Sequence, residues 1–93
     1  PTRIDKLRVT IADYASGHPL EEAGCRDGDL VVEIAGKRFQ SWSGARDLIR
    51  ETASSEEVKV ALLRGEQRLT VSVPGTTMKD QLRGYGALIP SVR

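Results

Sequence analysis

The segment Arg83-Gly84-Tyr85-Gly86-Ala87-Leu88-Ile89 has the residue types of an anion-binding turn that leads into a strand. Glycine adopts positive φ without steric cost, so successive N–H groups in such a turn can point to one place and surround an anion. The apolar residues that follow can offer a peptide an open strand edge. We therefore predict a turn that holds a chain-terminal carboxylate and a strand that pairs with the residues before it. The same pattern also fits an ordinary turn that enters a strand.

Residues with catalytic chemistry are few. The chain has one histidine, His18, and one cysteine, Cys25, and it contains no His-Glu-x-x-His, Gly-x-Ser-x-Gly or Gly-Lys-Ser pattern. A lone histidine is too little for a zinc site. We expect no catalytic residue, no metal site and no cofactor in this chain. Cys25 is interpreted as a small buried apolar residue, and Asp27 and Asp29 as structural turn residues.

Composition points to one small domain, which we place at residues 4–93. The 93 residues carry 14 Lys and Arg against 13 Asp and Glu, a net charge of +1, with 39% hydrophobic residues. Interleaved charges of both signs argue against nucleic acid as a partner. No apolar run approaches the roughly 20 residues of a membrane span, so contact with a membrane is expected only through a parent protein. Because the chain begins at Pro1 without methionine, we expect it to be a piece of something longer.

The first third of the chain predicts a strand, a short helix and a second strand. Apolar side chains alternate with polar ones in residues 3–11 and again in residues 30–35. Between them, Pro19 suits the first position of a helix at residues 20–23, and Gly24 suits its end. The expected inward positions are Leu7, Val9 and Ile11 in the first strand and Leu30, Val32 and Ile34 in the second.

The middle of the chain predicts the main helix. Ser41 can cap it through its hydroxyl, and residues 42–52 then carry apolar side chains at spacings of three and four. The stripe comprises Ala45, Leu48, Ile49 and Thr52. Phe39, just before the helix, is expected to lie in the core.

The last third predicts a hairpin and a final strand. Residues 58–63 and 69–73 alternate again around a polar turn at residues 64–67. The expected inward positions are Val58, Val60, Leu62, Leu69, Val71 and Val73. We interpret residues 76–82 as a polar connector, after which the final strand extends to Val92.

A resemblance to a known family lies in residues 19–37. They read Pro-Leu-Glu-Glu-Ala-Gly-Cys-Arg-Asp-Gly-Asp-Leu-Val-Val-Glu-Ile-Ala-Gly-Lys. A small helix, Ala-Gly, a two-residue turn, Gly28-Asp29, an apolar strand and a Gly turn follow one another as in a PDZ domain, and the chain resembles this family from about Leu7 to Val92. The resemblance implies an α+β, mainly β fold. It would be a partly open barrel or sandwich of five to six strands, capped by one short and one longer helix.

The order of the elements resembles a bacterial, circularly permuted form of the family, because the glycine turn comes last. Together with Ser41-Trp42 at the start of the main helix, it is similar to the PDZ domains of membrane-embedded site-2-type zinc metalloproteases. This likeness implies a location on the extracytoplasmic, periplasmic side of a membrane protein, with zinc only in the parent protease. The alternative is a PDZ domain of a trypsin-like periplasmic serine protease, where the glycine turn lies near the N-terminus.

The resemblance also implies the site residues. A peptide carboxylate would contact the N–H groups of Tyr85, Gly86 and Ala87 in the turn that starts at Arg83-Gly84, and Arg83 would support its charge. The peptide backbone would pair with Ala87, Leu88 and Ile89. The groove wall opposite that strand would be formed by Trp42, Arg46 and Ile49.

Two residues depart from the family pattern. Pro90 has no N–H, so the pairing edge ends there unless this position faces away from the ligand. Arg46 stands where the family more often has an apolar residue, which predicts either a partly closed groove or a preference for an acidic ligand side chain. Trp42 fits a groove lip and also a cap on the core, and we favour the core.

Three functions fit the sequence. The first is a non-catalytic module that recognises the C-terminus or an unfolded segment of a partner or cleaved substrate, as part of a protease. The second is a steric filter that excludes bulky substrates from a protease without binding a peptide end. The third is an interaction domain that binds another folded protein through its sheet edge.

Overall fold

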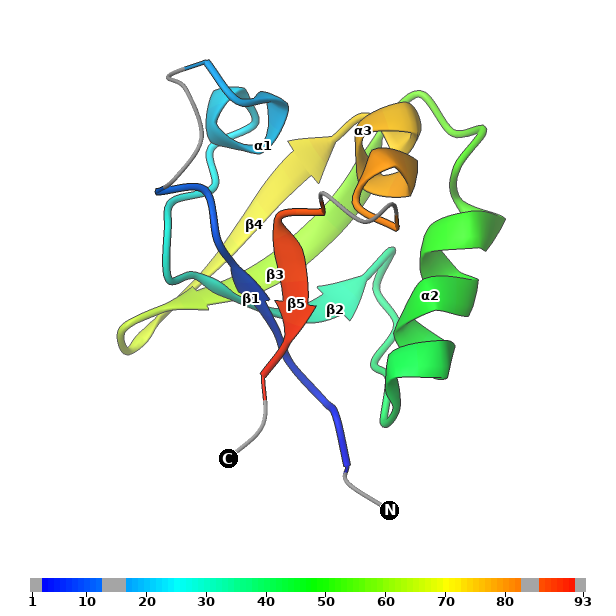
Figure 1. Cartoon of the computed structure of the whole chain (residues 1–93), viewed down its shortest axis with the longest axis horizontal. Helices are drawn as coiled ribbons and strands as arrows, with labels where there is room; N and C mark the ends of the chain where they lie inside the picture. Colours follow the sequence, from blue (N-terminus) through cyan, green and yellow to red (C-terminus); the bar gives the residue numbers. More distant parts are fainter. Residues whose placement is uncertain (1–2, 13–16, 83–85, 92–93) are drawn as a thin grey trace.

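The alternating apolar segments pair into one antiparallel sheet in the order β4-β3-β2-β1-β5 (Figure 1). The computed structural model describes residues 3–12, 17–82 and 86–91. The strands are β1 (Leu7–Val9), β2 (Leu30–Ile34), β3 (Val58–Arg64), β4 (Gln67–Val73) and β5 (Leu88–Pro90), and the helices are α1 (Pro19–Glu22), α2 (Trp42–Glu51) and α3 (Gly75–Asp80). The expected α+β, mainly β fold class is confirmed.

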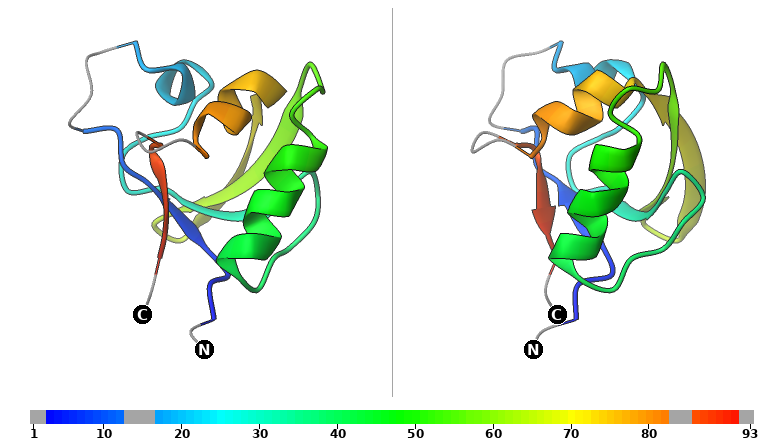
Figure 2. Two further views of the ribbon diagram at one scale, coloured as in Figure 1. Left: turned by 45° about the vertical axis from the view of Figure 1, so that its right-hand side comes forward. Right: turned by 90° about the vertical axis from the view of Figure 1, so that its right-hand side faces the viewer.

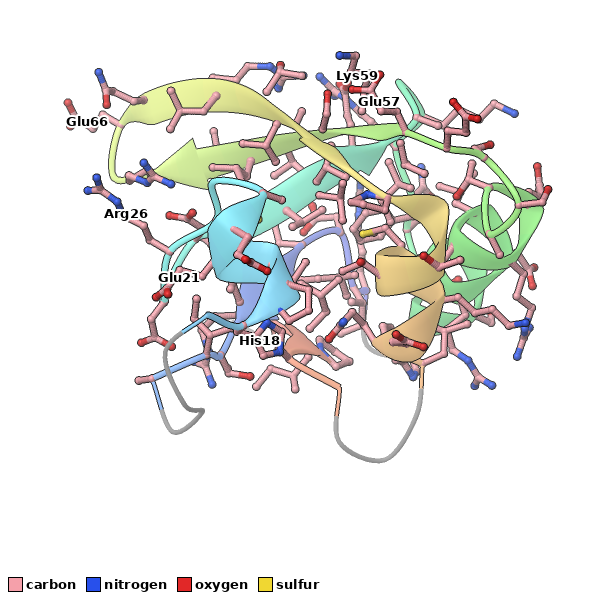
Figure 3. All side chains as sticks on the ribbon, turned by 90° about the horizontal axis from the view of Figure 1, so that it is seen from above. His18, Glu21, Arg26, Glu57, Lys59 and Glu66 are labelled. Carbon is pink, nitrogen blue, oxygen red and sulfur yellow. The ribbon has the colours of Figure 1, made fainter. Side chains whose placement is uncertain are left out.

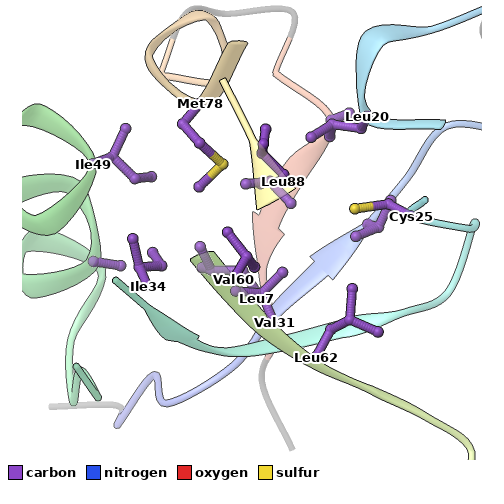
Figure 4. Close-up of a cluster of buried hydrophobic side chains, with 14 of the residues drawn as sticks. Leu7, Leu20, Cys25, Val31, Ile34, Ile49, Val60, Leu62, Met78 and Leu88 are labelled. Carbon is purple, nitrogen blue, oxygen red and sulfur yellow. The ribbon is translucent and has the colours of Figure 1, made fainter. Parts of the chain in front are cut away.

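The sheet curls around its core. In Figure 1, β1 and β5 cross in front of β3 and β4, and the right-hand view of Figure 2 shows β5 on the opposite side of the molecule from β3 and β4, while α2 and α3 lie at the open side. The enclosed side chains come from almost every element and include Leu7, Leu20, Ile34, Ile49, Leu62, Met78 and Leu88 (Figure 4). Each contributes roughly 2 kcal/mol when fully buried, so tertiary packing rather than helix propensity stabilises helices as short as α1 and α3.

Helix α2 forms as its sequence pattern indicates. The Ser41 hydroxyl accepts a hydrogen bond from the Gly44 N–H at 2.9 Å and caps the first turn. Ala45 and Ile49 are completely buried, and Leu48 is half-buried against the same core. The stripe fixes which face of α2 turns inward, and Arg46 is left at the edge of that face, half-buried.

Strand β2 differs from the expected alternation. Val31 and Ile34 are buried, whereas Leu30 and Val32 are only half-buried. Against β3 the register shifts between Val31 and Glu33, which is a β-bulge. The extra residue reverses the inward and outward faces along the strand, so the prediction for Leu30 and Val32 was wrong and that for Ile34 is confirmed.

The segment after β4 is a helix and not the predicted polar connector. Helix α3 buries Met78, and the Gly75 N–H donates to the Ser55 carbonyl at 3.1 Å, which ties the helix to the turn after α2. One apolar residue in six gave no periodicity from which to predict it. None of the helices in the described ranges has the length and hydrophobicity needed to cross a bilayer.

The turn between α1 and β2 is fixed by two aspartates, as the sequence predicts. Asp27 accepts hydrogen bonds from the N–H groups of Ile11 and Ala12. Asp29 is 2% exposed. It accepts one hydrogen bond from the Arg26 N–H at 2.7 Å and two from the Arg64 guanidinium at 3.0 and 2.9 Å. Burial acts to raise the pKa of Asp29, but these hydrogen bonds and the positive charges outweigh it and hold the pKa below its usual range.

Candidate functional site

Strand β5 is the edge of the sheet that the glycine turn leads into. Within the described residues it pairs with β1 alone, in the register Val9↔Leu88, Arg8↔Ile89 and Leu7↔Pro90. Two further hydrogen bonds flank this ladder: the Thr10 N–H donates to the Ala87 carbonyl at 2.7 Å, and the Ser91 N–H donates to the Lys6 carbonyl at 3.0 Å. Main-chain groups alternate in direction along an antiparallel strand. Ile89 therefore bonds toward β1, as do Ala87 and Ser91.

Leu88 and Pro90 are consequently the residues whose main-chain groups face the open edge. Leu88, a residue that is 3% exposed, directs both its N–H and its carbonyl away from β1, whereas Pro90 directs only its carbonyl there because proline has no N–H. The register thus places the missing donor at the second rung of the edge that the sequence prediction assigns to the ligand. The free edge of β5 is therefore short.

Ala87 uses its main-chain groups inside the protein. It is fully buried, its N–H donates to the Gln81 side-chain oxygen at 2.8 Å, and its carbonyl accepts from both the N–H and the hydroxyl of Thr10. Gln81 is itself 7% exposed and donates from its amide nitrogen to the Thr77 carbonyl at 2.8 Å. Gln81 therefore ties the end of α3 to the start of β5, a role that its sequence context did not indicate.

The other predicted site residues differ in how deeply they are buried. Gly86 is half-buried at the entrance to β5, while Arg83, Gly84 and Tyr85 lie outside the described residues. The side chains of Ile49 and Leu88 are buried with the core. Trp42 is half-buried and packs against the same cluster, as the core interpretation expects. Of the three side chains expected on the α2 wall, Arg46 has the clearest access to a ligand.

Arg46 lines a hollow of about 420 Å³ between the second half of α2 and α3. Its other lining residues are Arg50, Ala53, Lys79 and Leu82, so three cations surround two apolar side chains. Arg50 approaches the exposed Asp47 at 3.4 Å. In the described part of the chain, neither Arg46 nor Lys79 takes part in an ion pair.

A second hollow, of about 300 Å³, contrasts with the first because its charges are paired. It lies beside β2 and the segment that precedes α2. Its Arg68 and Arg38 contact Glu33 at 2.8 and 3.5 Å, and the hydrogen bond from Arg68, with the charges of both arginines, holds the pKa of Glu33 below its usual range. Asp5 likewise lies beside Lys6. The hollow between α2 and α3 is thus the better candidate for an anionic ligand group.

The described residues offer little for catalysis. No group of three His, Cys, Asp or Glu side chains in the described ranges could hold a metal ion. Cys25 is buried, and this burial, reinforced by the charge of Asp29, raises the pKa of its thiol to about 11. The Nδ1 atom of His18 accepts the Leu20 N–H and caps α1 (Figure 3). The arrangement can bind a chain but supplies no activated nucleophile among these groups.

Comparison with known proteins gives a family and a set of longer relatives. A family model described as "PDZ domain" matches residues 2–74, which ends before α3 and β5. The "Serine protease Do-like HtrA" of Bacillus subtilis is 30% identical over 66 residues, covering 70% of this chain and 15% of the relative. The "Regulator of sigma-W protease RasP" of the same organism is 32% identical over 60 residues, covering 64% and 14%.

A third relative, the "Probable periplasmic serine endoprotease DegP-like" of Rickettsia conorii, is 26% identical over 74 residues, covering 80% of this chain and 15% of the relative. The chain therefore spans less than a fifth of the length of each of these three relatives.

Proposed function

Because the chain belongs to the PDZ domain family, we propose that it binds an extended peptide, a C-terminus or an unfolded segment of a protein, as an added strand along β5 beside α2. The observation that carries this proposal is the position of β5 at the edge of the sheet, where its register with β1 directs both main-chain hydrogen-bonding groups of Leu88 away from β1. Strand addition draws its affinity from such groups and its selectivity from neighbouring side chains.

The parent protein is proposed to be a protease in which this domain is a non-catalytic part. The names of all three relatives described above contain the word protease or endoprotease. The order of elements, with the glycine turn last, and Ser41-Trp42 at the start of α2 favour a membrane-associated zinc metalloprotease with this domain on its extracytoplasmic side. A periplasmic serine protease is the alternative. The peptide-binding proposal is the same for both parents.

A steric filter is the second candidate function, and two observations favour it. The Ala87 N–H, which the family resemblance assigns to a ligand carboxylate, is occupied by Gln81, and Pro90 shortens the pairing edge. A domain with this edge can cover an active site without holding a peptide end. The two functions differ in one measurable property, which is saturable binding of peptides.

The test uses a set of seven-residue peptides and the single tryptophan, Trp42, as the fluorescent reporter, with amide chemical shifts as a second readout. Strand addition predicts micromolar binding and a large shift of the Leu88 amide. The control is the same peptide N-methylated at alternate residues, which keeps every side chain but removes main-chain donors. Equal binding of the two peptides, or no binding by either, would contradict strand addition, and the absence of binding would favour the steric filter.

A further inference from the structure

We infer that the hollow between α2 and α3 is a receptor for a carboxylate side chain, so that this domain selects peptides with Asp or Glu near the end that lies beside Ala87. The inference rests on the proposed function, since it names the ligand class of the same edge. The amide of Ala87 is buried and already bonded to the Gln81 oxygen at 2.8 Å, so it is not available to an incoming carboxylate.

The hollow lies at the correct end of the edge. Leu82 lines it, and the preceding residue, Gln81, bonds Ala87 at the start of β5. The turned views of Figure 2 show α3 above the C-terminal end of α2, with β5 beginning next to it. A peptide antiparallel to β5 therefore has its C-terminal residues beside the hollow. Because side chains alternate along a strand, every second side chain of the added strand points toward α2 there.

The charges of the hollow suit a carboxylate. Arg46 is half-buried, and no hydrogen bond or ion pair holds its side chain or that of Lys79 in the described ranges, while the Arg50 side chain is paired there with the exposed Asp47. Two arginines can each present paired N–H groups to a carboxylate, which is the geometry that gives short, charge-assisted hydrogen bonds. The apolar Ala53 and Leu82 accommodate the methylenes of Asp or Glu and reduce the screening of the charges by water.

A carboxylate can come from a side chain or from the end of the ligand chain, and the experiment separates these two sources. Four peptides of one sequence are compared by calorimetric titration, with Glu or Gln as the final residue and with a free or an amidated C-terminus. The proposal predicts that the amidated Glu peptide binds about tenfold more tightly than the amidated Gln peptide, and that the difference shrinks as salt is raised.

Variants locate the effect. Arg46→Gln and Lys79→Gln should each weaken binding of the amidated Glu peptide about fivefold, a clearly larger loss than for the amidated Gln peptide. Lys59→Gln is the matched control, because it removes the same charge from the outer side of the β3–β4 hairpin (Figure 3). Circular dichroism of each variant establishes that it is folded.

Equal affinity for the amidated Glu and Gln peptides overturns the inference, as does an equal effect of Arg46→Gln and Lys59→Gln. Tight binding of the Gln peptide with a free C-terminus also overturns the inference if Arg46→Gln does not weaken that binding. The C-terminal carboxylate would then be held by main-chain amides and not by the hollow. The proposed function would still stand. If none of the four peptides binds, both the inference and the proposed function fail.

Discussion

The side chain of Asp29 joins its own turn to the end of β3, 35 residues later in the sequence. It holds the Arg26 N–H within its own turn and the Arg64 guanidinium at the end of β3, and Arg64 also donates to the Gly24 carbonyl at 2.8 Å. The sequence predicts a turn role for Asp29 because the Gly-Asp pattern is local. It does not predict Arg64, which lies 35 residues away and belongs to a stretch interpreted as a hairpin turn.

Replacing Asp29 should change how stability depends on pH. Its folded-state pKa lies below the ordinary value of 3.8, so the carboxylate contributes stability that is present above that value and is lost as pH falls through the folded-state pKa. Asp29→Asn should lower the free energy of unfolding by about 2 kcal/mol at neutral pH. The difference in the free energy of unfolding between Asp29→Asn and the unsubstituted domain should become smaller in acid. Urea titrations from neutral pH to about pH 2 measure both effects.

The control for this prediction is Asp47→Asn, at an exposed helix position, which should cost less than about 0.5 kcal/mol. A loss of the same size at neutral and acidic pH would show that Asp29 acts through packing and not through its charge.

Cys25 should be chemically silent while the protein is folded. Its pKa of about 11 leaves roughly one thiol in a thousand ionised at pH 8, and its side chain is buried. We expect Ellman's reagent to label it slowly in buffer and at once in denaturing urea. Rapid labelling of the folded protein would mean that the end of α1 opens often enough to admit the reagent.

Gln81→Leu should destabilise the protein by about 2 kcal/mol, because the buried Ala87 N–H loses its acceptor while the side-chain volume stays similar. Thermal unfolding measures the change, with Gln67→Leu at an exposed position as the control. An unchanged unfolding temperature for Gln81→Leu would mean that the Ala87 N–H finds another acceptor. This contact was out of reach of sequence reasoning, because a glutamine in a polar segment carries no sign of burial.

At the scale of elements, hydrophobic periodicity predicts the helices and strands whose apolar residues recur at regular spacing. It misses a helix or strand that is stabilised by a single buried contact. Helix α2 and the β3–β4 pair agree with their patterns over most of their length. Strand β2 departs at its bulge, since a strand of strict period two was assumed, and β1 is three residues long instead of nine. Helix α3 was missed because its stability comes from Met78 and Gly75 rather than from an amphipathic stripe.

Gly75→Ala tests how closely α3 approaches the end of α2. A Cβ at this position would lie less than 3.0 Å from the carbonyl oxygens of Thr52, Ser55 and Ala53, all of which belong to the main chain. Relief requires α3 to move, so we expect a cost of about 2 kcal/mol and weaker binding in the hollow beside it. Chemical denaturation measures the cost, and Thr76→Ala, at the exposed next position, should change little. An unchanged midpoint for Gly75→Ala would show that the contact yields easily.

At the scale of the whole molecule, local motifs indicate the family but not the arrangement of the site. Gly28-Asp29 and its flanks predict a PDZ domain, and the family match over residues 2–74 confirms it. The candidate site joins β5 to β1, about 80 positions earlier, and gathers cations from two helices, one of which the sequence did not predict. Only the packed chain shows that Ala87 is occupied and that Arg46 and Lys79 share a hollow.

The antiparallel pairing of β1 with β5 also sets how the domain responds to force. Lys6 and Ser91 are bonded at the same end of this pair, so tension applied through residues 3 and 91 loads its hydrogen bonds one after another, as in a zipper. Tension applied through residues 12 and 91 loads them together, in shear. Optical-trap pulling should therefore rupture the first arrangement at lower force, and equal rupture forces would contradict this. A parent protein that is pulled through both ends of the domain would lose strand β5, and with it the peptide edge, before the rest of the fold gives way.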